Sequence, residues 1–275
     1  MNKLILGISS CPNDTFMFGN LLNNRKFNFD LRIEDIETLN AMAYREETDI
    51  TKLSFHAWLK LQDKYQLLNS GGALGENCGP ILVSKHKAYP DEIHDMTIAI
   101  PGDMTTANLL LSIFYPDIKS KKPYLFSDIE EAIMSEEVDA GLIIHENRFT
   151  YQQKGLNKIV DLGELWEKTY HVPTPLGGIA IHLRIKESTA IDIDKALHDS
   201  IVQAFDKPES VMPFVKQHAQ AMDSRVMKKH IGLYVNHYSL GNDEAYKKSI
   251  HNLSNIAHQH GLIPSAHQKP FVKHW

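Results

Sequence analysis

Short apolar runs that alternate with helix-like segments restrict how this chain can fold more than any other feature. Strand-like runs cover residues 4–8, 29–36 and 50–53, and helix-like segments cover residues 15–22, 38–47 and 55–63. The order strand, helix, strand, helix predicts an α/β protein with a mostly parallel sheet covered by helices. Asn13, Asp14 and Thr15 are the candidate N-caps of the first helix.

The same order resumes after a polar stretch that begins at Lys85. Strands are expected at 96–100, 139–144 and 179–183, and helices at 105–114, 127–136, 162–170 and over most of 192–261. Ser127 and Glu130 have the spacing of a capping box, and residues 171–178 read as a Pro/Gly linker. Two α/β lobes joined by two crossings fit this order, with residues 1–84 and 179–275 in lobe 1, which is discontinuous, and residues 85–178 in lobe 2. Such lobes hold a ligand in the cleft between them.

Length, charge and cysteine content narrow the class of protein. The 275 residues are enough for a substantial core, and every apolar stretch ends well before the roughly 18 residues of a membrane span. The net charge is −5 and there is no Lys/Arg cluster, so the sequence lacks the basic patch of a nucleic-acid-binding protein. Cys11 and Cys78 match neither a disulfide framework nor a zinc motif, so we expect a cytoplasmic protein. The expected partner is a small molecule rather than nucleic acid or a membrane, and the oligomeric state is unreadable.

The N-terminal residues allow a second interpretation. Lys3, an apolar run and Cys11 follow one another in the order of a bacterial lipoprotein signal. The run 4–8 has five residues, whereas a secretory signal needs about 7–15. A buried first strand is therefore favoured over a signal.

Polar side chains gather in the loops that follow the expected strands. Asn13 and Asp14 can receive a ligand at a helix N-terminus, or can simply cap that helix. Thr105 and Thr106 begin the helix after the 96–100 strand, where free N–H groups and the helix dipole favour a carboxylate or phosphate. The alternative for these threonines is again capping alone.

Two further loops carry candidate residues. His145 directly follows a buried strand, where it can act as a general base near neutral pH, although a lone histidine is more often structural. Lys52, Ser54 and Phe55 offer a cation, a hydroxyl and an aromatic face to an anionic, ring-bearing ligand, or are a solvated lysine and a core phenylalanine.

Histidine is abundant, with 15 residues. The segment after His145 lacks the second histidine of a zinc motif, and no metal site is expected. A solvated surface is favoured over metal binding for the C-terminal histidines, which are His251, His258, His260, His267 and His274.

Several motifs, in order and at matching spacing through the whole chain, resemble a single family. They are S-S-C-P-N-D-T-F-M-F from Ser9, T-K-L-S-F-H-A from Thr51, S-G-G-A-L-G from Ser70, P-G-D-M-T-T-A from Pro101, A-G-L-I-I-H-E-N-R-F-T-Y from Ala140 and P-T-P-L-G-G-I from Pro173. The chain resembles the 1,4-dihydroxy-6-naphthoate synthases of the futalosine route to menaquinone. The resemblance implies a two-lobed type II periplasmic-binding-protein-like fold with a ligand cleft between the lobes.

The resemblance also implies a lyase that converts cyclic dehypoxanthine futalosine to 1,4-dihydroxy-6-naphthoate without metal or organic cofactor. His145 takes the position of the family's proton acceptor. The implied substrate contacts are Lys52, Ser54, Thr105, Thr106 and Ala107. The competing class is a non-catalytic solute-binding protein for a small carboxylate ligand, which predicts export. A regulatory ligand-sensing domain would need an output module, for which no segment of this chain is left over.

Overall fold

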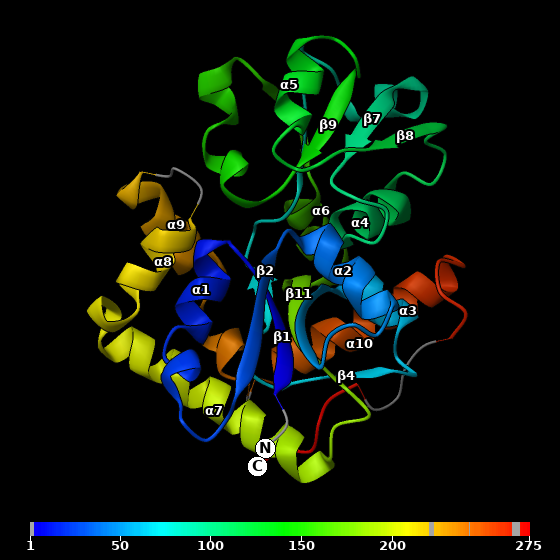
Figure 1. Cartoon of the computed structure of the whole chain (residues 1–275). Coiled ribbons are helices and arrows are strands. Elements are labelled where there is room, and N and C mark those ends of the chain that lie inside the picture. Colours follow the sequence, from blue (N-terminus) through cyan, green and yellow to red (C-terminus); the bar gives the residue numbers. More distant parts are fainter. Residues whose placement is uncertain (1–2, 220–222, 242, 266–269) are drawn as a thin grey trace.

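The protein has two lobes, each built around one β-sheet (Figure 1). The structure is a computed structural model and describes residues 3–219, 223–241, 243–265 and 270–275. His267, one of the histidines expected on the surface, lies outside the described residues. The α/β class predicted from the order of elements is confirmed.

The sheet of lobe 1 has six strands in the order β2-β1-β3-β11-β4, with β5 paired to β11. The strands are β1 (Leu4–Ser9), β2 (Phe29–Glu34), β3 (Ile50–Ser54), β4 (Tyr65–Leu67), β5 (Ala73–Gly75) and β11 (Thr174–His182). β1 pairs in parallel with β2 and β3, which confirms the predicted first strand. β11 returns from the other lobe and pairs antiparallel with β3, β4 and β5, so the sheet is mixed rather than mostly parallel.

The sheet of lobe 2 has five strands in the order β10-β6-β9-β7-β8. These are β6 (Ile81–Ser84), β7 (Thr97–Ile100), β8 (Ser120–Pro123), β9 (Ala140–Ile143) and β10 (Asn157–Asp161). β7 and β9 are parallel neighbours, so the loops after both strands emerge at the same edge of the sheet.

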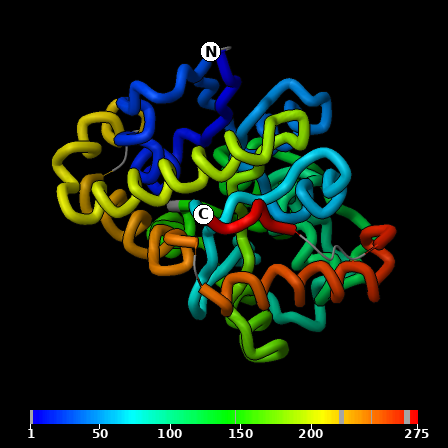
Figure 2. The backbone as a smooth tube through the Cα atoms, turned by 90° about the horizontal axis from the view of Figure 1, so that it is seen from below, coloured from blue at the N-terminus to red at the C-terminus, as the bar shows by residue number. Residues whose placement is uncertain are grey.

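Helices cover both sheets. The α-helices are α1 (Pro12–Phe18), α2 (Ile36–Tyr44), α3 (Phe55–Lys60), α4 (Thr106–Phe114), α5 (Ile129–Met134), α6 (Leu162–Tyr170), α7 (Glu187–Asp206), α8 (Met212–His218), α9 (Ser224–Tyr234) and α10 (Glu244–Gln259). Short 3-10 helices are η1 (Leu21–Asn23), η2 (Pro90–Asp95), η3 (His145–Phe149), η4 (Tyr151–Lys154), η5 (Pro208–Ser210) and η6 (His237–Leu240). Figure 2 shows α7 running across the underside of lobe 1 beside the C-terminal segment, where Lys273 pairs with Glu187.

The first helix begins three residues before the predicted start. Pro12 occupies its first turn, where the fixed φ of proline suits a helix and its missing N–H costs nothing. The predicted caps Asn13, Asp14 and Thr15 therefore lie inside α1, and Cys11 takes the N-cap position, where its side chain makes no capping hydrogen bond. Their polar atoms are used elsewhere, as the cavity shows below.

Two other local predictions are wrong. Ser127 and Glu130 form no capping box, because Ser127 donates to Asp128 while the Glu130 carboxylate accepts from Asn147 and Lys154. Residues 171–178 are not simply a linker, because β11 begins at Thr174. A register shift beside Pro175 accommodates the proline within the strand.

Strand pairing moves both predicted lobe boundaries. The boundary after residue 84 left β6 in lobe 1, but β6 pairs with β9 and β10 in the second sheet. The polar stretch that starts at Lys85 is a surface segment within lobe 2 rather than the crossing. The boundary after residue 178 divided β11, whose earlier residues pair with β5 and β3 of the first sheet. By pairing, the crossings lie just before Ile81 and just before Thr174.

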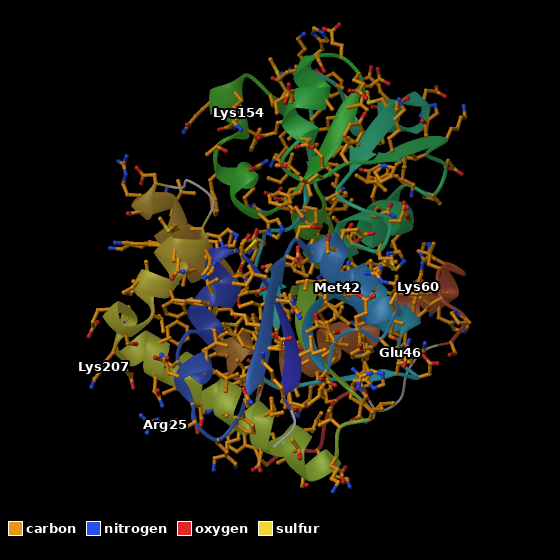
Figure 3. All side chains as sticks on the ribbon, in the orientation of Figure 1. Arg25, Met42, Glu46, Lys60, Lys154 and Lys207 are labelled. Atoms are coloured by element: carbon orange, nitrogen blue, oxygen red, sulfur yellow. The ribbon has the colours of Figure 1, made fainter. Side chains whose placement is uncertain are left out.

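Exposed charges lie around the outside of both lobes. Figure 3 labels Arg25, Lys60, Lys154 and Lys207 at the periphery, and all four are exposed. Among the described residues, no helix is both long enough and apolar enough to cross a membrane.

Candidate functional site

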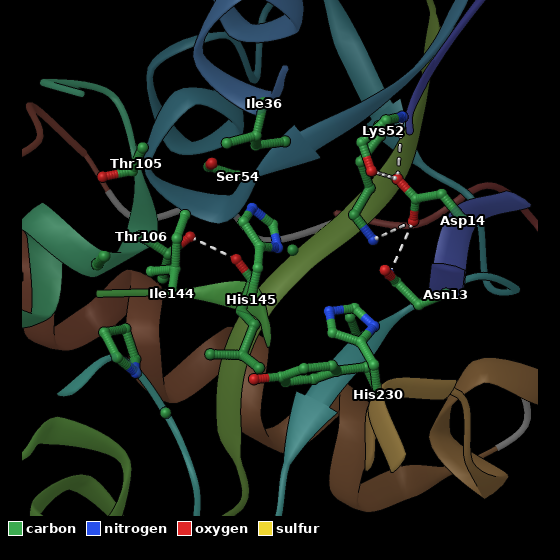
Figure 4. Close-up of a pocket in the computed structure, with 18 residues that line it drawn as sticks. Asn13, Asp14, Ile36, Lys52, Ser54, Thr105, Thr106, Ile144, His145 and His230 are labelled. Carbon is green, nitrogen blue, oxygen red and sulfur yellow. Dashed lines mark hydrogen bonds and ion pairs between the residues drawn. The ribbon is translucent and has the colours of Figure 1, made fainter. Parts of the chain in front are cut away.

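A cavity of about 90 Å³ lies between the lobes, beside the ends of β1, β3 and β9 and the start of α4 (Figure 4). Its lining residues come from both lobes and from the connections between them: Ser9, Asn13, Asp14, Ile36, Lys52, Ser54, Ala73, Gly79, Pro80, Thr105, Thr106, Ala107, Ile144, His145, Leu176, Gly177, His230 and Tyr234. This is the position expected for a ligand in a two-lobed α/β protein.

Every predicted site residue except Phe55 lines this cavity. Phe55 is fully buried, and its ring packs against Trp58 and Tyr246 instead. The interpretation of Phe55 as a core residue is therefore the one that the structure supports. Its backbone N–H still contributes to the site, because it donates to Oγ1 of Thr106 at 2.8 Å.

At one end of the cavity, the side chain of Asp14 connects α1 with the end of β1 and with β3. Its buried carboxylate accepts hydrogen bonds from the N–H and hydroxyl of Ser9, at 3.2 and 2.6 Å, and from the Asn13 amide at 2.9 Å. Lys52 Nζ lies 3.2 Å from the same carboxylate, and the side chain of Lys52 is only 7% exposed. The contact is an ion pair but not a hydrogen bond, and Nζ makes no hydrogen bond to any of the described residues. The ammonium therefore has donors to offer a ligand.

The start of α4 forms the other end of the cavity. Thr105 is the N-cap of α4, in agreement with the capping alternative for this residue, and its hydroxyl accepts the N–H of Asn108 at 3.2 Å. The hydroxyl of Thr106 donates to the carbonyl of Leu176 at 2.6 Å, so it ties α4 to β11 of the other lobe. Both hydroxyls are thus engaged within the protein. The N–H groups of Thr106 and Ala107 stand in the first turn, where a helix supplies no internal acceptors.

His145 follows β9 and faces the cavity at the N-terminus of η3. Its φ is 57°, which lies in the left-handed region that few non-glycine residues adopt and that is often found at functional sites. Nδ1 lies 3.4 Å from the sulfur of Cys11, and the ring of Phe126 packs edge-on at 5.0 Å. Contacts from two elements therefore fix the imidazole.

Comparison with known proteins identifies the family. Residues 4–259 match the family model described as menaquinone biosynthesis. The chain belongs to the menaquinone-biosynthesis family. Two curated relatives named 1,4-dihydroxy-6-naphtoate synthase are 37% identical, from Streptomyces coelicolor, and 36% identical, from Thermus thermophilus. The alignments cover 96% of both chains in the first case, and 99% of this chain and 100% of the relative in the second. This menaquinone-biosynthesis family member is accordingly an enzyme.

Solved structures agree with the two-lobed reading of this family member. A crystal structure of a protein from Archaeoglobus fulgidus is 32% identical and superposes with a TM-score of 0.89, covering 95% of this chain and 98% of that one. The ligand-binding component of an ABC-type import system from Staphylococcus aureus gives a TM-score of 0.73 at 13% identity, over 100% of this chain and 97% of that one. The second likeness concerns the fold alone, and it confirms the periplasmic-binding-protein-like architecture.

Sequence reasoning missed ten of the 18 lining residues, and two of these carry titratable side chains. His230 and Tyr234 come from α9, far along the chain from the loops that follow the strands. Burial, followed by the nearby charges of His145 and Lys52, lowers the pKa of His230 to about 3. Burial also raises the pKa of Tyr234. One sequence signal could have identified them: both residues lie on the apolar face of an amphipathic helix. A histidine on a buried face needs a hydrogen-bond partner, so its presence there indicates a site.

Arg148 anchors the segment that carries His145. Its guanidinium donates to the carbonyl of Gly79 at 2.6 Å and to the carboxylate of Asp161 at 3.1 Å. η3 is therefore tied both to the connection before β6 and to the end of β10. Across the ranges that the structure describes, no group of three or more His, Cys, Asp or Glu side chains has an arrangement that could hold a metal ion.

Proposed function

We propose that this member of the family is a 1,4-dihydroxy-6-naphthoate synthase of the futalosine route, with cyclic dehypoxanthine futalosine as its substrate. The relatives' names and the motifs of the sequence support this assignment. The structural observation that supports it best is that His145 and the start of α4 line one cavity. A proton acceptor and a site for a carboxylate thus share the same ligand space.

The carboxylate of the substrate's aromatic part is proposed to dock at the start of α4. The N–H groups of Thr106 and Ala107 and the positive end of the helix dipole favour an anion there. Thr105 and Thr106 support this site through their bonds to the protein rather than through free hydroxyls. The ammonium of Lys52 at the far end of the cavity contributes further positive charge.

His145 is proposed to be the general base. It takes a proton from the ring system of the substrate, and the electron pair of that C–H bond completes the aromatic ring of the naphthoate while the carbon–carbon bond to the sugar-derived portion breaks. The electron pair of the broken bond leaves with the sugar-derived portion, which takes the proton back from His145. Aromatisation supplies driving force, and general-base help of this kind contributes about 10²- to 10⁴-fold. Because Nδ1 is in contact with Cys11, we propose that the proton is transferred to Nε2. The scheme needs no cofactor, and we propose that the protein acts in the cytoplasm, where its substrate would be made.

Incubation of the purified protein with cyclic dehypoxanthine futalosine, followed by chromatography of the products, tests the activity. Formation of 1,4-dihydroxy-6-naphthoate is expected. A ligand that binds and is recovered unchanged would favour the solute-binding alternative. For the base, His145→Gln is expected to lower kcat by about 10²- to 10⁴-fold. The matched control is His251→Gln, in α10 and outside the cavity, and turnover by His145→Gln close to that of this control would refute the role of His145.

A further inference from the structure

His230 is a buried histidine of the cavity for which the general-base scheme has no use. Its ring lies on α9 and is fully buried, one helical turn from Tyr234, whose ring packs against it at 4.8 Å. Neither Nδ1 nor Nε2 has a hydrogen-bond partner among the described residues. Buried polar atoms are nearly always hydrogen-bonded, so two unpartnered nitrogens that border a cavity indicate a partner that enters with the ligand.

The surroundings of His230 determine what that partner can be. The ring lies 6.2 Å from the ring of His145, in a nearly parallel orientation, and the ammonium of Lys52 is a neighbouring positive charge. Burial and these charges hold the pKa of His230 near 3, so the imidazole is neutral at physiological pH. A neutral imidazole has one N–H donor and one acceptor nitrogen. A hydroxyl group matches this pair, since it also donates and accepts.

The cavity also separates two kinds of polar groups. Figure 4 shows Thr105 and Thr106 on one side and Lys52, Asn13 and His230 on the other, with His145 between them. The start of α4 suits a carboxylate. On the other side the charges of Lys52 and Asp14 oppose each other at 3.2 Å, and His230 and the amide of Asn13 are neutral. A substrate with a carboxylate on its aromatic part and hydroxyls on its sugar-derived part would have a complementary polarity along its length.

We propose that His230 binds a hydroxyl group of the sugar-derived portion of the substrate, and so holds the leaving portion while His145 acts on the bond next to it. The inference rests on the proposed function, since it assumes that substrate. His230 is thereby a substrate-binding residue that is specific for the part of the substrate absent from the naphthoate product.

The test compares substrate and product in His230→Leu and His230→Gln. His230→Leu removes both polar nitrogens at similar volume, and it is expected to raise KM for cyclic dehypoxanthine futalosine by about tenfold. Its Kd for 1,4-dihydroxy-6-naphthoate is expected to stay within about twofold of wild type, because the product lacks the hydroxyl-bearing part. His230→Gln keeps a donor and an acceptor, so its KM should fall between those of wild type and His230→Leu.

Thermal unfolding without ligand provides a readout that a purely structural role would not give. His230→Leu should raise Tm, because it removes buried nitrogens that lack partners in the unliganded protein. The matched control is Ser249→Ala in α10, outside the cavity. It also removes a buried polar atom that has no hydrogen-bond partner within the described part of the chain. Ser249→Ala should raise Tm and leave KM unchanged.

Each outcome decides the inference. An unchanged KM in His230→Leu, or an equal loss of affinity for substrate and product, would overturn it. If His230→Leu does not fold, His230→Gln carries the same comparison of KM with product Kd. Absence of naphthoate formation by the wild-type enzyme would instead refute the proposed function, so the two failures are distinguishable.

Discussion

The sulfur of Cys11 and Nδ1 of His145 are 3.4 Å apart, although the two residues stand on different lobes. Cys11 precedes α1 in lobe 1, and His145 follows β9 in lobe 2. For Nε2 to accept a proton, Nδ1 must carry the ring hydrogen and direct it at the sulfur. In the proposed scheme the sulfur of Cys11 therefore accepts from Nδ1, which favours the tautomer whose Nε2 takes the proton.

Replacing Cys11 should therefore impair turnover more than binding. Cys11→Ala removes the acceptor, and we expect kcat to fall by about tenfold with little change in KM, since one neutral hydrogen bond is lost. Cys11→Ser keeps an acceptor atom, although the serine side chain is shorter than that of cysteine. It should therefore retain more activity than Cys11→Ala. Steady-state kinetics of the two variants check this. Equal kcat for Cys11→Ala and wild type would show that the contact does not orient the base.

Breaking the buried ion pair of Asp14 and Lys52 should lower the free energy of unfolding of the protein. Asp14→Asn leaves the Lys52 ammonium buried without a counter-charge, which typically costs about 3–5 kcal/mol. Urea denaturation of the variant and the wild type measures this loss. A loss below about 1 kcal/mol would mean that the pair behaves as an exposed one.

A second substitution separates charge burial from binding. In Asp14→Asn with Lys52→Met, no unpaired charge remains, so most of the lost stability should return. Activity should not return, because the ammonium proposed to face the substrate is gone. Recovery of both properties together would contradict the assignment of Lys52 to the substrate site.

His56 should make the protein less stable as the pH falls from about 6.5 to 4. Burial, aided by the positive charge of Lys60, lowers the pKa of His56 from 6.5 to about 4. The unfolded chain therefore binds a proton in this window that the folded protein does not, and the free energy of unfolding falls as the pH falls. At about 1.36 kcal/mol per pKa unit, the loss through this residue is on the order of 3 kcal/mol.

Denaturation profiles between pH 4 and 8 check the role of His56. His56→Leu should flatten the profile between about pH 6.5 and 4, whereas His251→Leu, in α10, should leave it unchanged. Parallel profiles for wild type and His56→Leu would rule out this histidine as a cause of acid sensitivity.

Local sequence patterns predicted much of the fold, because helix caps and apolar runs act through residues that are neighbours in the sequence. α6 spans the predicted residues 162–170, and its N-cap Asp161 accepts two backbone N–H groups of the first turn. β1 was recognisable because a short apolar run between polar residues suits a strand buried in a sheet. Loops at the carboxyl ends of strands also predicted where Lys52, Thr105 and His145 would meet.

The remainder depended on long-range contacts that no local pattern contains. Phe55 directly follows β3 like a site residue, yet the start of α3 directs its ring into the core against Tyr246. The hydroxyl of Thr106 is occupied by the carbonyl of Leu176, a residue of the returning strand β11. His230 reaches the cavity only because α9 packs beside α1 and η3. Each of these outcomes is set by how distant segments pack rather than by neighbouring residues.

The last prediction concerns Gly102, which lies in the loop before α4 and against Glu37 of the other lobe. Glu37 accepts the N–H of Met104 at 2.9 Å, while Gly102 has a φ of 134° and would place a Cβ 2.4 Å from the Glu37 carboxyl carbon. Gly102→Ala should lower the free energy of unfolding by roughly 1–3 kcal/mol through backbone strain. It should also raise KM, because it pushes the loop proposed to bind the carboxylate away from Glu37. The control is Gly232→Ala in α9, where an added Cβ has no neighbour within 4 Å. This substitution should instead raise the free energy of unfolding by about 0.5–1 kcal/mol. Urea denaturation and KM for both variants test this, and a Gly102→Ala enzyme as stable and as tight-binding as wild type would show that the loop does not need its glycine.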